Sequence, residues 1–259
     1  MDEEQTRTFS RLIEENLDFF YIKSSEFPGF SRKVNEDFDW VFCSEVDWPN
    51  CIFKANLKDS VSKRIKAIKR QILDHKAPNG WTVGPLSTPL NLGEILEEHE
   101  FKNVYHQSGM ALELLNLKPN LNAPESLDVQ IIDDNDSLEG WSNCVSKSFN
   151  NIKISIGLIK FLKKQENFTF FAGKHKDEIA TALMRVDFPQ SVTGLHAVST
   201  LPNHRGNGYA LKLSRKALID AFNKNCKIAV LQASSMGEKV YTKLVFRKCC
   251  DIYSYELEM

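Results

Sequence analysis

The chain has 259 residues, 42% of them hydrophobic and 26% charged, which is enough apolar material for packed cores and too little charge for disorder. Its 33 lysines and arginines nearly balance 34 aspartates and glutamates, so the formal net charge is −1. Such a balance produces no whole-protein field that would attract nucleic acid or acidic lipid, and we expect neither as a partner. The length predicts about two domains.

The cysteines and the N-terminus indicate a reducing compartment. No two of the six cysteines form a Cys-x-x-Cys pair, and none has zinc-type spacing to a histidine, which predicts reduced thiols and no bound metal. The chain begins with Met-Asp-Glu-Glu, which is acidic where a signal peptide is basic, and no apolar run reaches the roughly 18 residues needed to cross a bilayer. We therefore expect a cytoplasmic protein that contacts no membrane.

The first domain is predicted over residues 1–118. Apolar residues between Phe9 and Phe20 predict an opening helix. Apolar residues from Val61 to Ile72 recur at spacings of four, three and four, which predicts an amphipathic helix. Further patterns predict a strand at residues 80–85 that ends in a turn, a short helix at 90–100 and a terminal strand at 110–115.

A linker is predicted between the two halves of the chain. Residues 115–126 hold two prolines and three asparagines, a composition that interrupts regular structure. We place the linker at residues 119–127 and the second domain at residues 128–259.

The second domain is predicted to combine strands with helices. The strand at residues 228–231, Ile-Ala-Val-Leu, is apolar on both faces and should lie in the middle of a sheet. Residues 168–186 have the pattern of an antiparallel hairpin around His175-Lys-Asp-Glu178. The other predicted elements are strands at 129–132, 192–198 and 252–257 and helices at 138–149, 210–221 and 236–244.

A glycine loop, Arg205-Gly-Asn-Gly208, lies between the strand that ends at Val198 and the helix that begins near Ala210. Glycine has no Cβ, so the backbone can turn sharply and present several N–H groups at the positive end of the following helix. Such a loop favours a phosphate-binding site. A surface turn before a helix is the alternative.

This loop and the later segment Tyr241-Thr-Lys-Leu-Val-Phe246 together resemble the GNAT (GCN5-related N-acetyltransferase) superfamily. The resemblance implies the GNAT fold over residues 128–259, an α+β architecture in which helices flank a mixed, mostly antiparallel sheet. In the superfamily the loop reads Gln/Arg-x-x-Gly-x-Gly/Ala, and its backbone amides hold the pyrophosphate of coenzyme A. Here Asn203 replaces the Gln/Arg, while both glycines fit.

The resemblance further implies acetyl-CoA as the acyl donor, bound without a metal. Val198 would contribute its backbone groups, because its side chain is interpreted as part of the core. Ser234 stands where many members carry an asparagine that contacts coenzyme A, and a helix N-cap explains this serine equally well. The predicted cofactor-binding residues are Val198, His204, Arg205, Gly206, Asn207, Gly208, Tyr209, Ala210 and Ser234.

Tyr241 is the predicted general acid. It matches the tyrosine of the superfamily's Tyr-x-x-Leu-Gly-Phe motif, whose phenol can protonate the departing thiolate. The alternative is a tyrosine packed on an amphipathic helix. Val245 replaces the glycine of the motif, a departure that concerns the turn after the helix.

The base that would take the amine's proton is marked less clearly. Some superfamily members carry a glutamate at the position of Val192, which cannot take a proton. His196 on the same strand is the nearest titratable side chain and is the candidate base. A histidine that only packs, with a water chain carrying the proton, is the alternative.

The first half of the chain shows a weak sequence similarity to the second. Residues 95–101 can be laid over residues 240–246, each after a strand and before a closing strand, with Leu96 at the tyrosine position. The first half has no Arg-Gly-x-Gly loop. We predict a degenerate GNAT-like N-terminal domain, and a coincidence between two short helices is the alternative.

The resemblance therefore predicts an N-acetyltransferase that moves an acetyl group from acetyl-CoA directly to a primary amine. No linear motif encodes the acceptor, and a homodimer is left open. A non-catalytic acyl-CoA sensor or pseudoenzyme is the alternative, because Val192, Asn203 and Val245 depart from the superfamily's pattern. A protein interaction module whose loop binds nothing is a third possibility.

Overall fold

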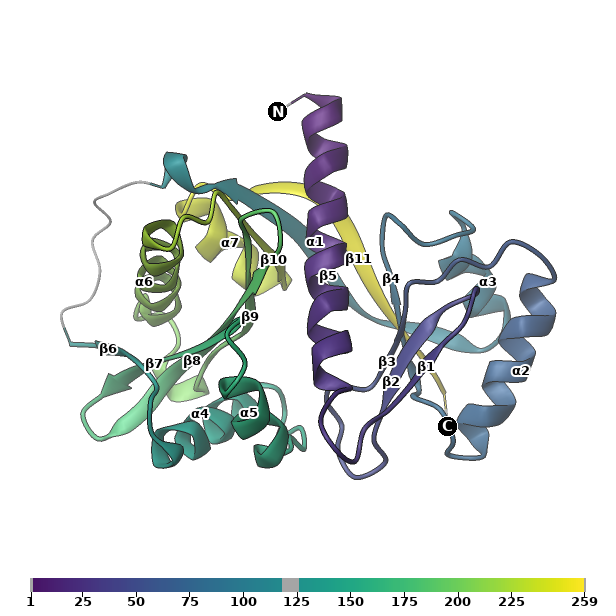
Figure 1. Ribbon diagram of the computed structural model, residues 1–259, viewed down its shortest axis with the longest axis horizontal. Helices are drawn as coiled ribbons and strands as arrows, with labels where there is room; N and C mark the ends of the chain where they lie inside the picture. The colour runs from purple at the N-terminus through teal and green to yellow at the C-terminus, as the bar shows by residue number, and fades with distance from the viewer. Residues whose placement is uncertain (1, 118–125, 259) are drawn as a thin grey trace. The chain divides into compact units, whose positions relative to one another are not determined.

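The computed structural model describes residues 2–117 and 126–258 (Figure 1). Contacts within the chain divide it into two compact units. Unit 1 comprises Met1–Gly109 and Cys249–Met259, and unit 2 comprises Met110–Lys248. Each unit has its own hydrophobic core, and the two are described in turn.

Unit 1 combines helices with a mixed sheet. Its elements are α1 (Glu3–Ser24), β1 (Ser31–Val34), β2 (Asp39–Phe42), β3 (Cys51–Phe53), α2 (Val61–Leu73), β4 (Gly80–Val83), α3 (Leu92–Glu98), the first part of β5 (Phe101–Glu113) and most of β11 (Arg247–Leu257). The strand order is β1-β2-β3-β4-β11-β5. Strands β3 and β4 run parallel, whereas the pairs β1–β2, β2–β3 and β4–β11 run antiparallel.

The helices of unit 1 form where the sequence predicts them. α1 begins after Asp2, whose side chain caps the helix by accepting a hydrogen bond from the backbone N–H of Gln5 at 2.8 Å. α2 buries Ile65, Ile68 and Ile72 along one stripe, as their spacing predicts. With β4 and α3, these helices confirm most of the elements expected in this half. β5 is longer than expected, because it starts before the predicted terminal strand.

Unit 2 also has a mixed sheet, and most of its strand pairs are antiparallel. Its elements are the end of β5, η1 (Leu114–Asn116), β6 (Asp128–Ile131), α4 (Asn135–Ser148), α5 (Ile156–Lys163), β7 (Phe168–His175), β8 (Glu178–Phe188), β9 (Val192–Thr200), η2 (Pro202–His204), α6 (Tyr209–Asn223), β10 (Ile228–Ala233) and α7 (Ser235–Lys243). The strand order is β5-β10-β9-β8-β7-β6. β9 and β10 run parallel, and β6 to β9 are successively antiparallel. This is the predicted fold class, and β10 lies inside the sheet between β5 and β9, as its two apolar faces indicate.

Helices cover both faces of the unit 2 sheet (Figure 1). Trp141 of α4 stacks edge-on against Phe170 and donates its indole N–H to the carbonyl of Leu183 at 3.1 Å. The next residue, Phe171, belongs to the cluster that packs against α6. Successive residues of a strand point to opposite faces, so α4 and α6 lie on opposite faces of the sheet.

The closing strands depart from the predicted domain boundaries. β11 follows α7 in sequence and was expected to complete the domain at residues 128–259, but from Cys249 onward it belongs to unit 1, where Tyr253 pairs with Val83 of β4. Conversely, β5 follows α3, but its residues from Met110 belong to unit 2. The partner of a strand is chosen by long-range backbone hydrogen bonds, which a local hydrophobic pattern does not specify. The predicted linker at 119–127 falls almost entirely outside the described residues.

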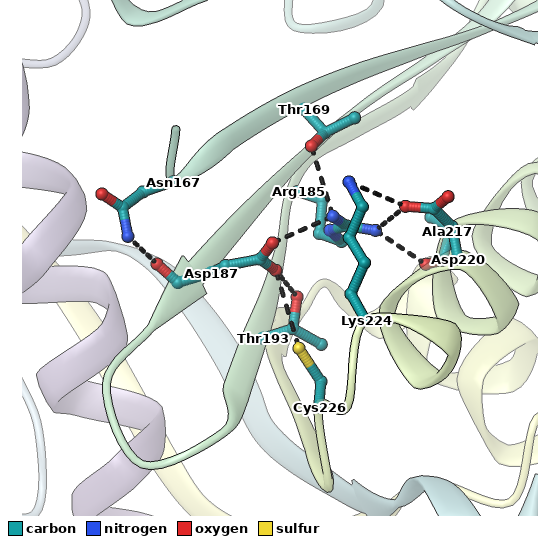
Figure 2. Close-up of polar contacts among 9 residues, drawn as sticks. All are labelled: Asn167, Thr169, Arg185, Asp187, Thr193, Ala217, Asp220, Lys224 and Cys226. Carbon is teal, nitrogen blue, oxygen red and sulfur yellow. Dashed lines mark hydrogen bonds and ion pairs between the residues drawn. The ribbon is translucent and has the colours of Figure 1, made fainter. Parts of the chain in front are cut away.

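A buried arginine joins the sheet of unit 2 to α6 (Figure 2). Arg185 on β8 has no solvent exposure, and its guanidinium donates to the carboxylates of Asp187 (2.9 Å) and Asp220 of α6. It also donates to Thr169 Oγ1 (3.3 Å) and the carbonyl of Ala217 (3.4 Å). Burial alone would raise the pKa of Asp220, but the hydrogen bond and charge of Arg185 outweigh it and lower that pKa. The network fixes the C-terminal half of α6 and therefore helps to set the position of its N-terminus.

Candidate functional site

The two parallel strands of unit 2 separate partway along their length. Their pairing runs from Val192 and Ile228 to Leu195 and Leu231 and goes no further, although β9 continues to Thr200. A gap therefore opens in the hydrogen-bond ladder between β9 and β10, in the part of β9 that leads to the glycine loop.

A β-bulge accounts for the separation. On the other side of β9, His196 pairs with Met184 and Ser199 pairs with Ala182, so two residues of β9, Ala197 and Val198, lie opposite one residue of β8. Ala197 has a φ of 50°, a left-handed conformation that bends the strand. The backbone of Val198 lies past the last paired residues of β9 and β10, the place at which the superfamily resemblance implies that it faces the acyl donor.

The glycine loop has the conformation that a phosphate-binding loop requires. Gly206 and Gly208 adopt φ values of 82° and 74°, which only glycine reaches without strain. Gly208 is the N-cap of α6, and no side chain caps this helix end in the described structure. The positive end of the helix dipole therefore remains available to an anion.

Side chains of the loop fasten its own backbone. Arg205 donates from Nε to the carbonyl of Thr200 and from Nη2 to the carbonyl of Ser148, each at 3.2 Å, which ties the loop to the ends of β9 and α4. Asn207 Nδ2 donates to the carbonyl of His204 at 3.1 Å. These bonds give Arg205 and Asn207 a structural task beside the cofactor contacts predicted for them.

Tyr241 and Ser234 lie on the last helix of unit 2. Ser234 is the N-cap of α7, because its Oγ accepts a hydrogen bond from the backbone N–H of Gly237 at 3.1 Å. Tyr241 is 6% exposed and belongs to the same apolar cluster as Leu195 and Leu231, the residues at which β9 and β10 stop pairing. The predicted acid therefore packs in the hydrophobic core of unit 2.

The turn after α7 keeps its shape without the glycine of the motif. Val245 has a φ of 62°, the left-handed conformation that a glycine would adopt freely. The backbone N–H of Val245 donates to the carbonyl of Thr242, and that of Phe246 donates to the carbonyl of Tyr241, both at 3.0 Å. Phe246 then packs edge-on against the Tyr241 ring, with centroids 5.8 Å apart. The departure at Val245 introduces backbone strain and leaves the tyrosine's packing intact.

His196 is buried on β9, at 7% exposure. Burial lowers the pKa of this histidine to about 4, so its ring is neutral at pH 7. A neutral imidazole can take a proton, but a pKa this low makes it a weak acceptor.

A groove of about 440 Å³ lies in unit 2 between α4 and the β7–β8 hairpin. Residues of α4, the β7–β8 hairpin and the end of β9 line it: Asp136, Ser137, Gly140, Asn143, Cys144, Lys147, Lys174, Asp177, Glu178, Ile179 and Leu201. The sequence predicts this hairpin, but no functional residue was expected in it. The histidine and the glutamate at its turn, His175 and Glu178, were the available signal.

The described residues show neither a metal centre nor a membrane segment. Within residues 2–117 and 126–258, no three metal-ligating side chains gather at one place, and no helix is both long and apolar enough to cross a bilayer. All six cysteines lie in these ranges, and no disulfide joins any two of them.

Known proteins similar to this chain share its fold. Residues 132–244 match the model of the acetyltransferase (GNAT) family. A search of curated proteins finds no match. Among solved structures, a GCN5-related N-acetyltransferase from Kribbella flavida is similar, with 14% identity, a TM-score of 0.69 and coverage of 92% of this chain and 95% of that one. A second, from Sphaerobacter thermophilus, has 12% identity, a TM-score of 0.62 and coverage of 88% and 82%.

The structural similarities extend over both units, whereas the family match lies within the second. At these identities the solved structures establish the fold, and the family model adds the evidence of sequence. Together with the glycine loop and the diverging strands, the family match identifies a GNAT acetyltransferase domain at residues 132–244 of this chain.

Proposed function

We propose that the chain is a cytoplasmic N-acetyltransferase that transfers an acetyl group from acetyl-CoA directly to a primary amine. The observation that carries the proposal is the geometry at the end of β9. The bulge at Ala197, the left-handed glycines 206 and 208 and the start of α6, which no side chain caps, follow one another within residues 197–209. Backbone N–H groups in such an arrangement suit a pyrophosphate, and the family match makes coenzyme A the expected carrier.

In the proposed donor site, backbone amides from His204 to Ala210 hold the pyrophosphate. Val198 offers its backbone groups to the pantetheine arm beyond the last paired residues of β9 and β10. Ser234, at the start of α7, is assigned to the same arm, in addition to its N-cap bond. No metal takes part.

In the proposed reaction, the amine nitrogen attacks the thioester carbonyl, forming the C–N bond, and the C–S bond then breaks. Tyr241 donates its phenolic proton to the departing thiolate, and a base removes the proton from the amine nitrogen. Most of the rate would come from holding the amine and the thioester together. We assign the base to His196, which passes the proton to water because its low pKa does not retain it.

Unit 1 is proposed to be a degenerate copy of the same fold. Like β9 and β10 of unit 2, its strands β3 and β4 are parallel and are connected by a helix. Lys54, just after β3, has a φ of 54°, which is close to the φ of 50° at Ala197, just after the paired part of β9. The segment from Lys54 to Ser60 contains no glycine, and Leu96 of α3 is fully buried at the tyrosine position. Such a unit would have no glycine-rich phosphate loop and no tyrosine at the position that corresponds to Tyr241.

A non-catalytic acyl-CoA sensor is the second candidate. The buried His196, with its pKa of about 4, favours it, since a weak base slows transfer without affecting donor binding. Binding of acetyl-CoA without release of free coenzyme A in a broad set of amines would support the sensor.

The testing experiment is a screen of an amine library for release of free coenzyme A, run with the wild type and Tyr241→Phe. We expect turnover with at least one amine and a drop of about 10²-fold in Tyr241→Phe, because general acid catalysis contributes factors of this order. Calorimetry should show little change in acetyl-CoA affinity for this variant, while Gly208→Trp should abolish binding. Unchanged turnover in Tyr241→Phe would remove the acid role.

A further inference from the structure

The β7–β8 hairpin contacts both ends of the glycine loop. His175, the last residue of β7, lies 2.8 Å through Nδ1 from the phenolic oxygen of Tyr209, the first residue of α6. Glu178, the first residue of β8, lies 3.0 Å through Oε2 from Nε2 of His204, the last residue of η2. The two pairs therefore bracket the stretch that contains both glycines.

Aromatic contacts reinforce the same arrangement. The rings of His204 and Tyr209 are stacked, with centroids 6.0 Å apart and an interplanar angle of 28°. The His175 ring lies 5.3 Å from the His204 ring and 5.7 Å from the Tyr209 ring. Three rings and one carboxylate thus form a compact cluster, which we call the hairpin clamp: His175, Glu178, His204 and Tyr209.

The clamp compensates for the conformational freedom of the two loop glycines. Gly206 and Gly208 give the loop its left-handed turns, but glycine has the largest conformational freedom of any residue and therefore the largest entropy to lose on ordering. An added Cβ at Gly206 would meet nothing within 4 Å, so packing around this residue does not hold it in place. Fixing the residues on either side lowers the entropy lost when the loop orders around an anion.

The contacts of Arg205 do not replace the clamp. They tie the middle of the loop to the carbonyls of Thr200 and Ser148, whereas the clamp holds His204 and Tyr209 at its two ends. Tyr209 is also 4% exposed, so its ring is anchored in the core while its hydroxyl reaches the hairpin.

We propose that His175 and Glu178 are positioning residues that pre-form the phosphate loop for the diphosphate of acyl-CoA. The inference rests on the proposed function. Neither residue acts on the acetyl group, so the clamp affects the binding of the donor and not the rate of the chemical step. The clamp does not strengthen the binding of donors that carry no phosphate.

The test compares two donors in the full-length protein. Glu178→Ala and His175→Phe each remove one clamp contact, and Asp177→Ala is the matched control, since it deletes an exposed carboxylate from the same turn. We expect the KM for acetyl-CoA to rise roughly 3- to 10-fold in the two clamp variants, the change that loss of one such hydrogen bond produces. The kcat should change less than twofold, and Asp177→Ala should match the wild type.

The second donor is S-acetylpantetheine, which has the thioester and the pantetheine arm but no diphosphate. Its kcat/KM should be the same in the wild type and the clamp variants. An equal loss with both donors would overturn the proposal, because it would show a general disturbance of the active site rather than an effect through the phosphate loop.

Calorimetry with coenzyme A separates this inference from the proposed function. If the wild type binds coenzyme A and transfers no acetyl group, a 3- to 10-fold weaker Kd in the clamp variants alone still supports the clamp. If the wild type binds coenzyme A and the variants bind it equally well, the clamp is overturned and the proposed donor site stands. A wild type that does not bind coenzyme A overturns both.

Discussion

At the scale of single residues, the loop glycines are required by backbone conformation rather than by space. Gly206 has a φ of 82° and open surroundings, so the strain of a side chain at this position comes from the backbone alone. We expect Gly206→Ala to lower the free energy of unfolding by about 1 kcal/mol, while Gly206→Asn should cost less, because asparagine tolerates left-handed conformations. Urea denaturation of both variants measures the difference. Equal stability of the alanine and asparagine variants would contradict it.

Glu14 on α1 is a buried carboxyl group whose ionisation opposes folding. It is 2% exposed and accepts the backbone N–H of Leu86 at 2.8 Å. Burial raises its pKa from 4.5 to about 7, despite this hydrogen bond, and the charge of Glu15 adds to the rise. The folded protein therefore holds a proton that the unfolded chain releases, and this contribution to stability is present below pH 4.5 and is lost as the pH rises to about 7.

We expect Glu14→Gln to be more stable relative to the wild type at pH 8 than at pH 4.5, by about 3 kcal/mol, because glutamine keeps the acceptor oxygen and does not ionise. Thermal or urea unfolding of both proteins across this pH range tests the sign. A wild-type minus variant difference that does not change with pH would show that folding leaves the pKa of Glu14 unchanged.

At the scale of elements, the Arg185 network decides how α6 meets the sheet. Removing the guanidinium leaves the carboxylates of Asp187 and Asp220 close to each other and without their buried cation. We expect Arg185→Met to lower the free energy of unfolding by about 3 kcal/mol. Lys224→Ala is the control, because Lys224 reaches Asp220 at 3.4 Å from an exposed position and such pairs contribute little. If denaturant unfolding gave the two variants the same free energy of unfolding, the buried network would not contribute to stability as proposed.

At the scale of the whole molecule, the closing strands make each half depend on the other. Unit 1 takes β11 from the C-terminal end of the chain, where Tyr255 and Leu257 are buried in its core, and unit 2 takes Met110 and the residues that follow it in β5. A fragment of residues 128–259 therefore has β11 without β4 and β10 without β5. We expect this fragment to give no cooperative thermal transition by circular dichroism, whereas the full chain gives one. A monomeric fragment that melts cooperatively would contradict the assignment of β11 to unit 1.

Local sequence patterns were sufficient for the parts of the fold in which a residue's neighbours along the chain determine its structure. The spacing from Val61 to Ile72 predicted α2, the apolar run at 228–231 predicted the central β10, and Arg205-Gly-Asn-Gly208 marked the loop before α6. Helical periodicity and the turns that glycine permits depend on only a few neighbouring residues, so both can be predicted directly from the sequence. Strands β1, β2 and β3 and the helix α5 carry weaker periodicity and were not predicted.

The resemblance to the GNAT superfamily, the position of the glycine loop and the choice of Tyr241 and His196 as candidates follow from the sequence. Four features required the folded structure: β11 completes unit 1, β9 bulges at Ala197, His196 is buried with a pKa of about 4, and His175 and Glu178 reach the two ends of the loop. Strand partners, burial and contacts between segments far apart in the chain arise from long-range packing and desolvation, and no local pattern of residues encodes them.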